Sequence, residues 1–282
     1  MSTVARAPLL GGMATRVAAG VIVLLVLIAI AAPVLAPADP VAQPDIVHGK
    51  NLPPSAAHLL GTDSYSRDVL SRVIYGARTS LAVAALAVLV ALAIGASVGA
   101  IAGYAGGATD RWLMRTVDAL LSVPRLLLLL VIAAAFGQLS VLGLVLVLGL
   151  TGWPAMSRVV RAQVRESAAL DHIAAARALG LTPARILVRH VMPAVLPQVL
   201  VIATLAVASV IPLEAGLSFL GLGVPAPSPS WGNIIQEGYD ARMQAWWLIL
   251  FPALAIVMTV LCVNVLGERM RERLDPRLRP PV

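Results

Sequence analysis

Residues that could carry chemistry are scarce in this chain of 282 residues, because only 12% are charged and 59% are hydrophobic. Its one lysine, Lys50, lies between Gly49 and Asn51, whereas a loop that cradles nucleotide phosphates needs Gly-Lys followed by Ser or Thr. The histidines do not gather with Cys or carboxylates at the spacing of metal ligands. They are His48, His58, His172 and His190. We therefore predict no catalytic residues, no ATP site of this kind, no metal and no other cofactor in this chain.

Glu214 and Arg125 are ionisable residues that lie deep inside apolar runs. Glu214 lies in VIPLEAGLSF, where a carboxyl group is costly unless it meets water, a partner or the interior of a helix bundle. It is our candidate for a residue that lines a pathway through a membrane. A hydrogen bond between packed helices explains it equally well. Arg125 lies in another apolar run, and we expect its long side chain to reach the inner membrane surface.

A charged stretch, DHIAAARALGLTPARILVRHVMPAVLP (171–197), separates two very apolar regions. The residues from 167 to 179 are good helix formers, and Gly180 is a typical helix stop. Thr182 and Pro183 have the residue types that begin a second helix, which Pro193 and Pro197 should end. We thus predict two short helices joined at Gly180.

The first of these helices carries mostly alanine and should dock closely into a groove of another protein. The predicted docking residues are Ala174, Ala175, Ala176, Arg177, Gly180, Leu181 and Pro193. A plain solvated loop whose arginines only set membrane topology is the simpler alternative. A DNA-binding helix-turn-helix is disfavoured, because a loop held at both ends by the membrane can hardly enter a major groove.

Six apolar runs are long enough to cross a bilayer, which takes about 20 residues per helix. They are 16–36, 79–103, 116–137, 139–160, 195–220 and 246–267. We therefore predict an all-α integral membrane protein with six transmembrane helices. The first run could instead be a secretory signal, since Ala36-Pro37-Ala38 resembles a cleavage site, but its length favours a retained span.

Basic residues orient these spans. If the N-terminus is cytoplasmic, 16 of the 21 Lys and Arg residues fall in inner segments, and the positive-inside rule then places both termini in the cytoplasm. We divide the chain into an N-terminal transmembrane helix with an external segment (1–78), a core of five transmembrane helices with a cytoplasmic loop at 161–194 (79–267), and a cytoplasmic tail (268–282).

Two further patterns concern packing. Gly95, Gly99 and Gly103 share one helix face, which allows close approach of a neighbouring helix, either within the bundle or at a dimer seam. Trp231, Trp246 and Trp247 lie in or beside the last outer segment and are typical of an interfacial aromatic belt.

The spacing from Ala174 to Pro193 resembles the "EAA" loop of bacterial ABC-importer inner-membrane permeases. Ala174 stands where that motif has Glu, and Met192 where it has Leu; the first departure removes a charge that could pair with the ATPase. Four other stretches resemble the "C"-type permease of the dipeptide, oligopeptide and nickel subfamily, over about residues 58–279. They are LGTDSYSRDVLSRVIYGARTSL (60–81), AGYAGGATD (102–110), EAGLSFLGLGVPAPSPSWGNII (214–235) and LDPRLR (274–279).

This resemblance implies the type I ABC-importer permease fold and a subunit of a peptide importer in the bacterial inner membrane. It also implies four kinds of partner: a second, homologous permease, two cytoplasmic ATP-binding subunits, an extracytoplasmic substrate-binding protein and the lipid bilayer, with no nucleic acid. The chain would not itself be an enzyme. Nickel or another small solute is the alternative cargo, and a gradient-driven transporter or a membrane scaffold is the alternative class.

Overall fold

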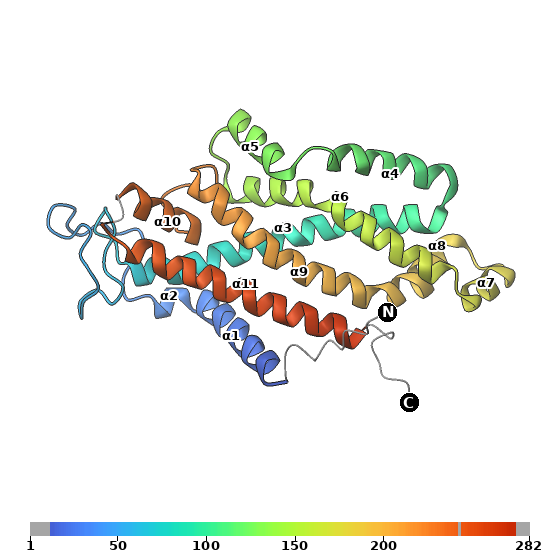
Figure 1. The fold of residues 1–282 in the computed structure, drawn as a ribbon, viewed down its shortest axis with the longest axis horizontal. Coiled ribbons are helices and arrows are strands. Elements are labelled where there is room, and N and C mark those ends of the chain that lie inside the picture. The colour runs from blue at the N-terminus through green and yellow to red at the C-terminus, as the bar shows by residue number, and fades with distance from the viewer. Residues whose placement is uncertain (1–11, 242–243, 275–282) are drawn as a thin grey trace, which may run out of the picture.

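The computed structural model describes residues 12–241 and 244–274, which form a helical bundle (Figure 1). Arg6, Arg242 and the predicted tail beyond 274 lie outside the described residues. The helices of the described part are α1 Gly12–Ile30, α2 Ala32–Leu35, α3 Val69–Ala105, α4 Gly107–Leu121, α5 Arg125–Phe136, α6 Val141–Ala168, α7 Asp171–Ala178, α8 Pro183–Ile186, the π-helix η1 Leu187–Val191, α9 Met192–Phe219, α10 Trp231–Asp240 and α11 Trp247–Leu274.

Five continuous helical stretches of the described residues are long and apolar enough to cross a membrane. They are α1, α3, α6, the stretch Pro183–Phe219 that ends with α9, and α11. The third predicted span, 116–137, is wrong as a single helix. It consists of α4 and α5, which are bent by 74° at a short break and count as a sixth span only when taken together.

Backbone constraints explain this broken span. Gly106 and Gly107 separate α4 from α3 with φ of 62° and 56°, a region that glycine enters without steric cost. Pro124 interrupts the next turn with ψ of 122°, and α5 begins at the following residue. The apolar run that suggested one span therefore starts in an amphipathic helix and ends in a short apolar one.

The spans place the connecting segments at two ends of the bundle. Figure 1 shows α7 at one end, here called the inner end; α11 runs toward this end, and α1 runs away from it. Residues 37–68 and α10 lie at the opposite, outer end. Helix α3 extends ten residues further out than the predicted span, because the Asp68 carboxylate caps it by accepting from the Ser71 N–H.

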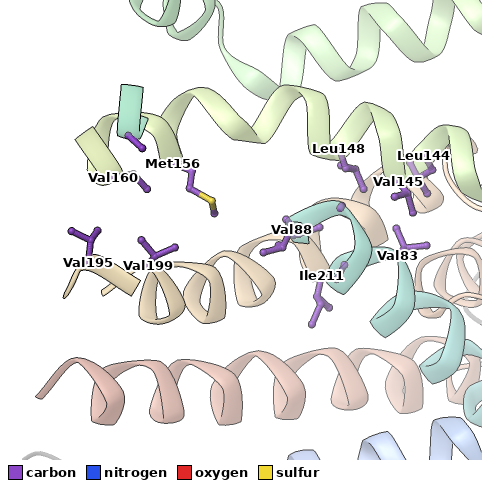
Figure 2. Close-up of a cluster of buried hydrophobic side chains, with 14 of the residues drawn as sticks. Val83, Val88, Leu144, Val145, Leu148, Met156, Val160, Val195, Val199 and Ile211 are labelled. Atoms are coloured by element: carbon purple, nitrogen blue, oxygen red, sulfur yellow. The ribbon is translucent and has the colours of Figure 1, made fainter. Parts of the chain in front are cut away.

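The core lies where α3, α6 and α9 meet, and its side chains are mostly Val, Leu and Ala (Figure 2). The glycine stripe of α3 faces α6. A Cβ built on Gly95 would lie 2.9 Å from the Trp153 carbonyl oxygen, and one on Gly99 would lie 2.5 Å from the Ser157 carbonyl oxygen. The stripe therefore packs inside the bundle and does not form a dimer seam.

The outer end is held by buried ion pairs. The Arg67 Nε donates to Asp63 over 2.6 Å and its Nη2 donates to Glu237 over 2.8 Å. Arg72 donates to the same two carboxylates, with one bond of 2.9 Å to Glu237. Residues 63–72 are thereby fixed to α10, a helix from a distant part of the sequence.

Two of the three tryptophans do not form the expected aromatic belt. Trp231 is fully buried and its indole N–H donates to the Val73 carbonyl over 3.1 Å. The Trp247 indole, also buried, donates to the Thr62 carbonyl over 3.0 Å. These side chains fasten α10 and α11 to the start of α3, and only Trp246 is half exposed.

Candidate functional site

The candidate docking loop forms a helical hairpin at the inner end, built from α7 and α8. Its turn is a Schellman motif at the end of α7: the Leu181 N–H donates to the Ala176 carbonyl over 3.3 Å, and the Gly180 N–H to the Arg177 carbonyl over 3.0 Å. Gly180 has φ of 77°, as the αL position of this motif requires. The predicted turn at Gly180 is therefore present.

The helices on either side of that turn differ from the prediction. The first helix does not run from 167 to 179, because α6 extends to Ala168 and α7 begins at Asp171. The second does not end at Pro193 and Pro197. It continues through the π-helix η1 into α9, and Pro193 lies directly after the π-helix, at the second position of α9. The hairpin is therefore continuous with α9 and is separated from α6 only at residues 169 and 170.

The two faces of α7 have different neighbours. Ile173 is fully buried and Ala176 nearly so, and with Ile186 of α8 they join the core cluster. Ala174, Ala175 and the other outward residues of α7 are exposed. Leu179, just beyond its end, is 81% exposed. The hairpin thus offers small side chains and one free leucine on a rigid support.

Arg177 is turned toward the chain itself. Its guanidinium lies 5.3 Å from the centre of the Tyr104 ring at the end of α3, and Nη2 reaches the Ala168 carbonyl over 3.4 Å. The side chain therefore joins α7 to the ends of α3 and α6. Sequence reasoning missed Tyr104 and Ile173, because nothing in the local pattern shows which bundle residues lie behind the hairpin.

The other predicted docking residues do not form a single surface. Leu181 is half-buried against the core cluster. Pro193 is exposed on α9, more than two turns along the chain from the hairpin turn. The structure thus brings Ala174, Ala175, Gly180 and Leu179 together on the outward face. Of these, Leu179 was not among the predicted residues.

A hollow of about 640 Å³ adjoins the base of the hairpin. Its walls come from α6, α9 and α11, and from Leu170 in the link to α7. Polar groups in the wall include Gln163, Gln198 and Arg271. The hollow leaves space between α6 and α9, the two helices that carry the hairpin.

Glu214 lies far from this hairpin, in the outer part of α9, and is fully buried. Its carboxylate accepts from the Ser218 hydroxyl over 2.7 Å and from the Ser80 hydroxyl over 2.9 Å. The Ser80 hydroxyl oxygen also accepts from the backbone N–H of Trp231 over 3.3 Å. These hydrogen bonds around Glu214 therefore link α3, α9 and α10. This geometry favours the packing interpretation over a pathway role, which stays a prediction.

Arg125, which we expected to reach the inner membrane surface, contacts the backbone of α6. It begins α5 at the break, and its Nη2 donates to the Leu148 carbonyl of α6 over 2.8 Å. Gly152 leaves room for the guanidinium, since a Cβ built there would lie 3.0 Å from that nitrogen. The break in the third span thus places this charge on the α6 backbone.

Over the residues from 12 to 274 that are described, no three His, Cys, Asp or Glu side chains gather where they could hold a metal. Cys262 is buried, as a small apolar side chain would be. The inner end thus offers an exposed contact surface on α7.

The sequence matches two families. Residues 95–280 match the family described as "Binding-protein-dependent transport system inner membrane component", and residues 14–54 match the "N-terminal TM domain of oligopeptide transport permease C". The first match covers the broken span, α6, the hairpin, α9 and α11.

Similar proteins agree with these two family matches. The chain is 39% identical to the dipeptide transport system permease protein DppC of Bacillus subtilis, over 93% of this chain and 82% of the relative. It is 37% identical to the oligopeptide transport system permease protein OppC of the same organism, over 92% and 84%. A putative peptide transport system permease protein of Brucella suis is 38% identical over 90% and 86%.

One solved structure has the same fold. A chain of the MetNI methionine ABC transporter, in an inward-facing conformation, superposes with a TM-score of 0.60. It covers 73% of this chain and 98% of the other, at 19% identity. The bundle with its inner-end hairpin is thus the fold of an ABC-importer permease, and the chain belongs to the family of binding-protein-dependent transport system inner membrane components.

Proposed function

We propose that this permease conducts dipeptides or oligopeptides through a bacterial plasma membrane, as half of a pathway that it shares with a second, homologous permease. Two cytoplasmic ATP-binding subunits dock on the inner ends of the permeases, and an extracytoplasmic protein delivers the substrate. Both termini are cytoplasmic, which agrees with the basic residues of the inner segments. The similar proteins from Bacillus subtilis, which transport dipeptides and oligopeptides, support this class of substrate.

The outward face of α7 is the single observation that carries the ATP-driven mechanism. Ala174, Ala175 and Leu179 are exposed, so a groove on another protein can approach the helix backbone closely. The same helix is fastened to α3 and α6 through Arg177. A partner that moves α7 would therefore move the ends of two membrane spans with it.

A gradient-driven transporter would need ionisable groups along a path through the bilayer. Two ionisable groups deep in apolar runs are both engaged: Glu214 with serine hydroxyls and Arg125 with a backbone carbonyl. Movement of rigid helices, driven by a partner that binds one state more tightly, fits the structure better.

The substitution Gly180→Asp tests this mechanism. Asp tolerates the left-handed backbone better than most residues, and nothing lies within 4 Å of a Cβ built at this position. The cost to folding is therefore about 1 kcal/mol, while a carboxylate now stands in the docking surface. We expect the protein to insert normally, and peptide uptake by the reconstituted complex to be uncoupled from ATP hydrolysis.

Gly137→Asp is the matched control. Gly137 also has a positive φ, of 71°, and open space around a built Cβ, but it lies between α5 and α6, away from the hairpin. This variant should transport normally. Normal uptake and normal substrate-stimulated ATPase activity in Gly180→Asp would refute the docking mechanism, and uptake of nickel in place of peptides would refute the substrate class.

A further inference from the structure

Helix α4 is held to the bundle by charge more than by apolar contact. Val117 is its one buried residue, and α5 adds only Leu129 and Ala133. By contrast, α3 and α6 each bury ten or more residues. Large exposed side chains such as Trp112 and Leu120 cover the rest of α4. Apolar packing alone therefore fixes α4 weakly.

Two ion pairs join α4 to α6 along the inner half of the bundle. Asp110 and Arg161 form a two-point contact, Nε to Oδ1 and Nη2 to Oδ2, the second over 2.6 Å. Asp118 and Arg158 form the other pair. Figure 1 shows α4 running beside α6 in this region.

The first pair is the stronger link. Its side chains are 14% and 28% exposed for Asp110 and Arg161, against 57% and 51% for Asp118 and Arg158. A fork of two parallel bonds also fixes orientation, which a single contact does not. Exposed pairs such as the second contribute little in water.

Both ends of α4 are breaks that can act as hinges. Gly106 before it and Gly107 at its first position have positive φ, and the 74° bend at residues 122–124 follows it. Across that bend, Arg125 holds the start of α5 on the Leu148 carbonyl. Helix α4 is therefore a short segment between two breaks, and the stronger of its polar contacts with a neighbouring helix is the Asp110–Arg161 pair to α6.

Helix α6 in turn leads directly to the docking hairpin. It is continuous from Arg161 to Ala168, and Arg177 of α7 contacts the Ala168 carbonyl. A displacement of α7 is thus passed to α6, and from Arg161 to Asp110.

We propose that the ion pair between Asp110 and Arg161 couples the broken span α4–α5 to α6. Through this pair, here called the drive link, a displacement of the α7 hairpin is transmitted by α6 to α4. Asp110 and Arg161 are positioning residues: they touch neither substrate nor nucleotide, and they make α4 follow α6 during the transport cycle. The inference rests on the proposed function, because it needs a partner that moves α7.

The test uses the complete importer, purified with both permeases and the ATP-binding subunits and reconstituted in lipid vesicles with the binding protein. The variants are Asp110→Arg, Arg161→Asp and the double exchange of both. The readout is the number of peptides taken up per ATP hydrolysed, a ratio that a loss of stability alone would not change. We expect each single reversal to lower this ratio about tenfold and the double exchange to restore most of it, in keeping with coupling between contacting charges.

Glu272→Arg is the matched control, since Glu272 pairs with Arg269 only within α11; it should leave the ratio unchanged. If a reversed variant does not assemble, Asp110→Asn, which removes the charge without reversing it, decides by the same ratio. A ratio within about twofold of the unmodified protein in the single variants, or no recovery in the double exchange, overturns the drive link.

These results are separable from a failure of the proposed function. If ATP-binding subunits do not copurify with the unmodified chain, or if peptide does not stimulate their hydrolysis, the proposed function is wrong. If they copurify and are stimulated, but the single reversals transport normally, only the drive link is wrong.

Discussion

The two ends of this bundle differ in how their charged side chains are paired. At the outer end, Asp63, Arg67, Arg72 and Glu237 neutralise one another in a buried network that joins α3 to α10. At the inner end, the hairpin keeps Ala174 and Ala175 exposed, and among the described residues no ion pair engages Arg185 of its second helix. The buried charges of the outer end are thus paired within the chain, whereas the inner end leaves a surface for a partner.

The difference reflects what each end must do. A buried pair contributes little net stability but is costly to break, because one partner is left charged without compensation. Such a network keeps segments distant in sequence in register. Helix α7 has a different role, because its outward face carries small exposed side chains. This face contributes little to the stability of the fold, and its contact area stays free for association with another protein.

Arg72→Ala should have the largest effect on stability. It leaves Asp63 and Glu237 with Arg67 as their one remaining cationic partner, so we expect a loss of about 3–5 kcal/mol. Thermal unfolding of the purified protein in lipid nanodiscs measures this loss. Arg78→Ala is the control, because Arg78 is exposed on the same helix and should change stability by less than about 0.5 kcal/mol. Equal melting temperatures for the two variants would show that the network is dispensable.

Ile173→Ala tests the packed base of the inner end. Ile173 is fully buried under α7, and truncating it should cost about 2 kcal/mol, the low end for such a change, since a hairpin at the edge of the bundle can relax. Unfolding measured as above reports the loss.

Leu179→Ala tests the outward face of the hairpin in the same way. With a side chain that is 81% exposed, it should leave stability within about 0.5 kcal/mol but weaken retention of the ATP-binding subunits on purification. If Leu179→Ala destabilised the chain more than Ile173→Ala does, the assignment of the two faces would be wrong.

Glu214→Gln should have the smallest effect. The amide keeps the size of the carboxylate. Ser80 and Ser218 donate to different carboxylate oxygens, so the amide oxygen can accept from one hydroxyl while the NH2 group donates to the other. A packing role therefore predicts a change of no more than about 1 kcal/mol and unaltered peptide uptake. A pathway role predicts that uptake changes while the melting temperature does not. Uptake and unfolding measured on one preparation therefore decide between the two.

Local patterns determined much of what could be predicted. The apolar runs, the break at Gly180 and the helix start at Pro183 depend on composition and on backbone chemistry within a few residues, and each is present in the structure. Even the shared face of Gly95, Gly99 and Gly103 followed from helical periodicity, although its neighbour, α6, did not.

Only the tertiary structure decided which distant groups meet. Asp110 and Arg161, or Arg72 and Glu237, are pairs separated by 51 and 165 positions, and no local rule selects one arginine among many. The bend before Arg125 places that side chain on a carbonyl of α6, and Trp231, expected in an interfacial belt, is buried in the core. Periodicity specifies the faces of each helix, but the partners across those faces depend on how the whole bundle packs.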